Sequence, residues 1–187
     1  MVGTLMGVAA QANWVSLCTA SIAVDAPTTG VVTFPAFDLL MIQYSITGYS
    51  VADVAGFNFN MTQDFGFGGF HADRHLYAPS GTTTLTDSFD NAGAAGTGLS
   101  IRVAGFTTTQ AQGGVAHVQA ASSSTNFHPV VIYNSTTSAA GTTPPIEMPG
   151  AGSFQLTDAI YSVELLTRGG NNMLAGSGFA VFGANIG

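Results

Sequence analysis

One short run carries the densest group of side chains that could do chemistry: His71, Ala72, Asp73, Arg74 and His75. Alternate residues of a strand share one face, so His71, Asp73 and His75 would point the same way. Imidazole and carboxylate groups are ligands that transition metals accept. The competing interpretation is a polar loop in which Asp73 pairs with Arg74 or with a histidine. We favour that loop, because no carboxylate–histidine motif of catalytic spacing accompanies the run, and we expect neither metal nor cofactor.

The other candidates for catalysis do not combine into a site. His117 and His128 each read as a partly buried, hydrogen-bonded histidine. Glu147 lies in a run bracketed by prolines and Glu164 on an expected solvent face, so the sequence offers no carboxylate pair for glycoside hydrolysis. A Gly-x-Ser-x-Gly nucleophile elbow is absent, and a phosphate-binding loop would need a lysine, which the chain lacks. We therefore expect no enzymatic activity.

The scarcity of charge excludes several classes of partner. Asp, Glu, Lys and Arg make up only 7% of the 187 residues, against about 25% in ordinary soluble domains. The net charge is −7 and the only cations besides histidine are three arginines. A nucleic-acid binder needs several cations to replace phosphate counterions, so we expect no nucleic acid as partner. An anionic membrane is disfavoured for the same reason, and no apolar run reaches the roughly 18 residues of a membrane span.

The rest of the composition favours an assembled protein. Hydrophobic residues make up 46% of the chain, and the remaining polarity comes mainly from Thr, Ser, Asn, Gln and Gly. A surface of neutral polar groups repels little and suits packing against other subunits. The single cysteine, Cys18, excludes an intrachain disulfide and reads as a small buried hydrophobe.

Period-two patterns recur along the chain and helical patterns hardly appear. Leu40, Ile42, Tyr44 and Ile46 fall on one face of an expected strand at 37–46. The Gly-Gly pairs at 68–69, 113–114 and 169–170, and Pro149-Gly150, read as turns. The spacing predicts about eight to ten short strands in a jelly-roll-like antiparallel β-sandwich with long loops and little or no helix. The other expected strand regions are 31–34, 54–59, 99–104, 115–118, 127–133, 161–166 and 179–182.

We expect one domain over residues 1–187, with residues 1–12 as a possible extended N-terminal arm. The stretch 60–86 is the longest without clear alternation, and long loops in compact β domains often carry function. It contains a glycine–aromatic run that reads as buried core or subunit contact rather than as a sugar platform. The residues expected at an interface are Met1, Val2, Leu5, Met6, Phe65, Phe67, Phe70 and Tyr77.

Two segments resemble tailed-phage capsid decoration (cement) proteins and related jelly-roll virion proteins. The first is Phe37-Asp38-Leu39-Leu40-Met41-Ile42-Gln43-Tyr44 with its continuation through Phe57-Asn58-Phe59-Asn60. The second is Ile160-Tyr161-Ser162-Val163-Glu164-Leu165 with Gly178-Phe179-Ala180-Val181-Phe182-Gly183. The resemblance spans most of the chain and carries over no catalytic residue.

The resemblance implies a structural virion protein on the outer capsid surface, present as a homotrimer. Its partner would be the major capsid protein, whose neighbouring copies it would bridge to stabilise the shell. The alternative is a tail-fibre or spike module for host recognition, in which Phe65, Phe67, Phe70 and Tyr77 would stack on a glycan. A small hydrolase on a jelly roll ranks last, because no acid–base groups combine into a site.

Overall fold

The computed structural model describes residues 13–51, 53, 55–60, 72–77, 86–91, 99–100, 111–119, 121, 130–137, 147–153, 159–167 and 169–186. For 72–77, 86–91, 99–100, 137 and 147–153 the backbone alone is described. These residues form strands and no helix, which confirms the predicted all-β fold. The strands are β1 (Val15–Ser21), β2 (Val32–Thr33), β3 (Leu39–Ile46), β4 (Ala55–Phe59), β5 (Ala72–Tyr77), β6 (Thr86–Asn91), β7 (Leu99–Ser100), β8 (Gln112–Gln119), β9 (Val130–Thr137), β10 (Glu147–Ser153), β11 (Ser162–Thr167) and β12 (Gly178–Ala184).

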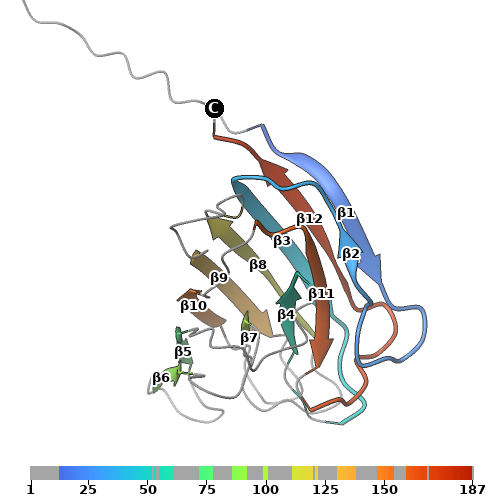
Figure 1. The fold of residues 1–187 in the computed structure, drawn as a ribbon. Helices are drawn as coiled ribbons and strands as arrows, with labels where there is room; N and C mark the ends of the chain where they lie inside the picture. The colour runs from blue at the N-terminus through green and yellow to red at the C-terminus, as the bar shows by residue number, and fades with distance from the viewer. Residues whose placement is uncertain are drawn as a thin grey trace, which may run out of the picture.

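The strands form two antiparallel sheets (Figure 1). The large sheet has the order β1-β12-β3-β8-β9-β10-β5-β6, and the small sheet has the order β2-β11-β4-β7. The pairing is nested along the chain: β1 pairs with β12, β2 with β11, β3 with β8 and β4 with β7. Strands β9, β10, β5 and β6 then extend the large sheet beyond β8.

Strand β3 shows why the sequence folds this way. Leu40, Ile42, Tyr44 and Ile46 are all buried, while the residues between them are half-buried or exposed. This alternation turns one face of the strand to the core and the other to solvent. The predicted strand and its predicted inner face are therefore both confirmed.

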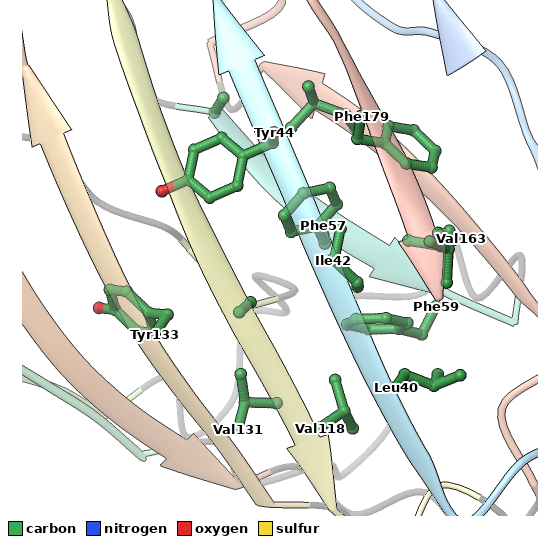
Figure 2. Close-up of a cluster of buried hydrophobic side chains, with 14 of the residues drawn as sticks. Leu40, Ile42, Tyr44, Phe57, Phe59, Val118, Val131, Tyr133, Val163 and Phe179 are labelled. Atoms are coloured by element: carbon green, nitrogen blue, oxygen red, sulfur yellow. The ribbon is translucent and has the colours of Figure 1, made fainter. Parts of the chain in front are cut away.

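The core lies between the two sheets, as Figure 2 shows. The Phe57 ring, from β4 of the small sheet, meets Tyr44 and Phe179 of the large sheet edge-on, with ring centroids 5.6 and 5.7 Å apart. Edge-to-face aromatic pairs at this distance add to the free energy gained by burial. Phe59 and Val163 extend the contact toward Leu40. The two sheets are thus held face to face by large side chains from both layers.

Two predicted turns lie inside strands instead. Gly113 and Gly114 belong to β8, where Gly114 stands opposite Tyr44 of β3. A Cβ on Gly114 would lie 2.5 Å from Tyr44 Oη, so glycine provides room for the tyrosine ring rather than a turn. Pro149 belongs to β10, at a position paired with β9 but beyond the end of its pairing with β5. Proline is tolerated there because its missing N–H removes no ladder bond.

Other expectations need smaller corrections. Pro129 directly precedes β9, as expected for a proline at either an edge strand or a strand entry; because β9 lies between β8 and β10, it marks the strand entry. Glu147 opens β10 rather than lying in a loop. Strand β5 lies within 60–86, where the sequence showed no alternation. The turn at 169–170 is confirmed: Gly170 has a φ of +76°, and the Asp53 carboxylate accepts hydrogen bonds from the N–H groups of Gly169 and Asn171.

A short chain of side-chain hydrogen bonds crosses the interior. Tyr49 Oη donates to Gln112 Oε1 at 3.0 Å, and Gln112 Nε2 donates to Ser135 Oγ at 3.1 Å. These bonds link the segment after β3 to β8 and β9 inside the core. Burial raises the pKa of both Tyr44 and Tyr49 well above the ordinary tyrosine value. Both phenols therefore stay neutral at physiological pH and act as core groups.

The close approach of Tyr44 to β8 predicts the effect of two neighbouring substitutions. Gly114→Ala should lower the free energy of unfolding by about 1–3 kcal/mol, because its methyl group would overlap the Tyr44 ring and the carbonyl oxygen of Asn134. Gly113→Ala is the matched control, since its methyl group meets only the Tyr44 carbonyl at 3.4 Å. Urea unfolding of both variants measures the difference. Equal stability of the two variants would contradict this role of Gly114.

The buried phenols predict a loss of stability at alkaline pH. Their pKa values are raised on folding, so the stability they contribute is complete below the unfolded value of about 10 and falls as pH rises beyond it. Urea unfolding between about pH 8 and pH 11 should show this fall, and Tyr44→Phe should make it shallower. Tyrosinate absorbance offers a second readout. Full ionisation of all five tyrosines in the still-folded chain would show the assignment to be wrong.

Candidate interaction surface

The solvent-facing side of the large sheet is the most distinctive surface of the described chain. We define the outer face as the outward-pointing residues of β1, β12, β3, β8 and β9. Its central row crosses four strands through the cross-strand pairs Phe182–Met41, Met41–His117 and His117–Ile132. Ile132 is 52% exposed, and its neighbour on the same face, Val130, is 41% exposed. A band of large side chains, apolar except for the imidazole of His117, therefore lies on the solvent-facing side of the sheet.

No charged residue interrupts this band. The sequences of β1, β12, β3, β8 and β9 contain no Asp, Glu, Lys or Arg. Roughly a quarter to a third of an ordinary soluble surface is charged, so a face of this size would normally carry several charges. The polar positions of the outer face hold neutral groups instead, such as Gln43, Asn134 and Thr136. A face without charges can be desolvated at low cost, which suits burial against another surface.

Trp14 adds a large aromatic group to the outer face. Its ring lies edge-on to His117 of β8, with the ring centroids 6.4 Å apart, although Trp14 itself directly precedes the edge strand β1. Trp14 is 39% exposed. The start of the described chain thus contacts β8, in the middle of the large sheet. His117, which the sequence suggested was partly buried, is exposed on this face.

Charge concentrates at the other end of the same sheet. The sequences of β10, β5 and β6 contain Glu147, Asp73, Arg74, Asp87 and Asp90. These three strands continue the sheet beyond β9. The large sheet therefore consists of an uncharged part built on five strands and a charged end built on three.

The carboxylates whose side chains are described bind the chain's own groups. Asp25 accepts a hydrogen bond from the Ala175 N–H at 2.9 Å, and Asp38 accepts one from the Ile186 N–H at 2.8 Å. Together with Asp53 at the 169–171 turn, these groups hold the loops around β12. They act as loop anchors and form no pair suited to acid–base catalysis.

Glu164 is buried, although the alternation of residues along the strand predicted that it faces solvent. It is only 8% exposed, and the expected solvent face is therefore wrong. Asn58 Nδ2 donates to its Oε1 at 2.9 Å, and Thr28 Oγ1 donates to its Oε2 at 3.0 Å. The contact from Thr28 comes from a residue 136 positions away in the sequence. The alternation of neighbouring residues could not predict that Glu164 is buried, because this contact comes from so distant a residue.

Of the residues of the predicted metal site and interface, the structure describes the backbone of Asp73, His75 and Tyr77. Asp73 and His75 lie two positions apart on β5 and Tyr77 ends that strand. His71 and His128 lie outside the described residues, as do Met1, Val2, Leu5, Met6, Phe65, Phe67 and Phe70. Among the residues described, no group of three His, Cys, Asp or Glu side chains could hold a metal ion. The same part of the chain contains no helix that is long and apolar enough to span a membrane.

Sequence reasoning missed the outer face, although a signal for it was present. Along 39–46 the positions between the core residues are Leu39, Met41, Gln43 and Ser45, none of them charged. The same holds at 112–119 and 130–137. Each strand alone looks ordinary in a chain of low charge. The pattern becomes informative only when the pairing order places these strands side by side.

Cys18 lies on the inner side of β1, half-buried against the core. Burial raises the pKa of its thiol, so little reactive thiolate is present at neutral pH. This is close to the predicted buried hydrophobe, with more exposure than expected. Cys18 is therefore a packing residue rather than a nucleophile.

The contact between Trp14 and His117 makes a prediction that the chain's single tryptophan can report. His117→Ala should raise the acrylamide quenching of Trp14 fluorescence and shift its emission to the red, because the ring loses its partner on the outer face. Gln119→Ala is the control, since it changes the same strand and the same face. Identical quenching in both variants would show that Trp14 does not rest on His117 in solution.

Comparisons with known proteins were made at three levels. Protein-family models, curated proteins and solved structures all gave no match to this chain.

Proposed function

We propose that this chain is a structural virion protein, a capsid decoration or cement protein that stabilises the shell by bridging major capsid proteins. Its fold would be a jelly roll. The nested pairing of β1 with β12, β2 with β11, β3 with β8 and β4 with β7 supports this assignment. A long hairpin that is wound across two sheets produces such nesting, with four of its eight strands in each sheet. Strands β5, β6, β9 and β10 would be additions to that core.

The observation that carries the proposal is the uncharged outer face. A free monomer is kept soluble by surface charge, and this chain has little of it on its broadest described surface. The band through Met41, His117 and Ile132 combines exposed apolar groups with neutral amides and hydroxyls. Such a surface is suited to permanent burial in an assembly rather than to transient, charge-steered binding.

The mechanism would be mechanical. Each square ångström of apolar surface removed from water contributes roughly 25 cal/mol, before the cost of association. A subunit that covers the joint between two shell proteins would lose that contribution whenever the joint opens. The free energy of opening the shell rises accordingly, with no covalent step. The loop anchors Asp25, Asp38 and Asp53 keep the bridging subunit rigid.

A host-recognition module remains the second candidate. Its motivating observation is the aromatic content of 65–77, which could stack on sugar rings. Of these residues, Tyr77 lies on β5, at the charged end of the large sheet and away from the outer face. A glycan array probed with the purified protein separates this function from the structural one.

Pelleting with undecorated capsids tests the proposed function. The purified protein should co-sediment with the particles at a fixed stoichiometry and should raise the temperature at which they open, because each bound copy buries surface across a joint. Particles that already carry their decoration protein are the control and should take up none. Protein that stays in the supernatant at every concentration would contradict the cement function and favour the glycan-binding module.

A further inference from the structure

We propose that the outer face is buried against other copies of this same chain, at the symmetry axis of a homo-oligomer. This inference deepens the proposed function and rests on it for the assembled setting. It names the partner of the outer face as a second copy and leaves the capsid contacts to other surfaces.

The charge distribution favours a second copy over a different protein. Residues near a symmetry axis lie close to their own copies, so any charge there meets a like charge. A chain with a net charge of −7 could attract a cationic partner only by presenting carboxylates to it. The outer face presents none, and the charged strands β10, β5 and β6 lie at the far end of the sheet. An uncharged face can meet its own copy in any register without like-charge contacts, whereas a cationic partner would find no carboxylate on these strands to attract it.

The neutral side chains of the outer face can pair with themselves. Gln43 and Gln119 are exposed there, and each amide carries both donors and an acceptor. The same group on a neighbouring copy can therefore satisfy each amide. Around them, Ile132 and Val130 provide apolar surface that gains by burial. Such a face is self-complementary in chemistry.

The area is sufficient for a stable contact. Five strands about 4.8 Å apart, each seven or eight residues long with a rise of about 3.3 Å, give a flat footprint of roughly 550 Å². The accessible area of a surface covered with side chains exceeds its footprint. Stable interfaces bury about 800 Å² on each partner. The outer face alone thus supplies most of what a lasting oligomer needs.

The mass of the purified full chain in solution tests this inference. Light scattering after size exclusion, and sedimentation equilibrium, should show a defined oligomer for the wild-type chain. Val130→Asp and Ile132→Asp should each weaken association at least about 100-fold, because a carboxylate would be buried beside its own copies. Val24→Asp is the matched control: Val24 is 74% exposed in the segment after β1, outside the outer face, and its variant should keep the wild-type mass.

Further measurements separate association from folding and from capsid binding. Ile132→Thr keeps a β-branched side chain and should weaken association while the circular dichroism spectrum stays that of the wild type. A wild-type chain that is monomeric at every concentration, or Asp variants at 130 and 132 that keep the wild-type mass, would overturn the inference. Capsid pelleting is scored separately. An oligomer that fails to pellet would support the self-contact and contradict the cement function. A monomer that pellets with capsids would support the cement function and contradict the self-contact.

Discussion

A strand displays every second residue on the face opposite the core, and this constraint governs the whole protein. Once Leu40, Ile42 and Tyr44 turn inward to meet Phe57, the intervening residues Met41 and Gln43 must face outward. The same alternation in the paired strands β8, β9 and β12 joins their outward residues into one face. Packing of the core and exposure of the outer face are therefore two results of one arrangement, and neither can change alone.

The carboxylates whose side chains the structure describes serve this arrangement. Asp25, Asp38 and Asp53 each accept hydrogen bonds from backbone N–H groups in the loops that flank β12. Glu164 is bound by Asn58 and Thr28 on the small sheet. Carboxylates that are hydrogen-bonded in this way hold loops in place, and none of these four lies in the strands that form the outer face. Anchored loops and an uncharged outer face are thus compatible in one chain.

The all-β fold could be predicted from sequence because its signals are local. The run 39–46 alternates cleanly, and Gly169-Gly170 forms the expected turn. The predictions that were wrong concern residues whose place in the fold depends on partners far away in the sequence. Gly114 lies inside a strand because the Tyr44 ring occupies the space of its missing side chain. Pro149 fits inside β10 because the pairing of β10 with β5 begins only at the next residue, Gly150.

The candidate surface was harder to predict than the fold. Its residues come from strands that are far apart in the chain, with β12 inserted between β1 and β3. Periodicity shows which residues of one strand point outward but not which strand lies beside it. The predicted exposure of Glu164 was wrong for the same reason, because Thr28, which donates a hydrogen bond to its carboxylate, lies in a distant segment. Pairing order is the information that the sequence patterns lack.

Hydroxyl-radical footprinting can compare the assembled protein with a dilute, dissociated sample. Met41 lies on the outer face, whereas Tyr161, 46% exposed, lies beside the small sheet just before β11. If the outer face is the interface, oxidation of Met41 should fall sharply on assembly, while oxidation of Tyr161 should fall less. Equal oxidation of Met41 in the two samples would contradict this role of the outer face, because a face that stays open to solvent in the assembly cannot be its interface.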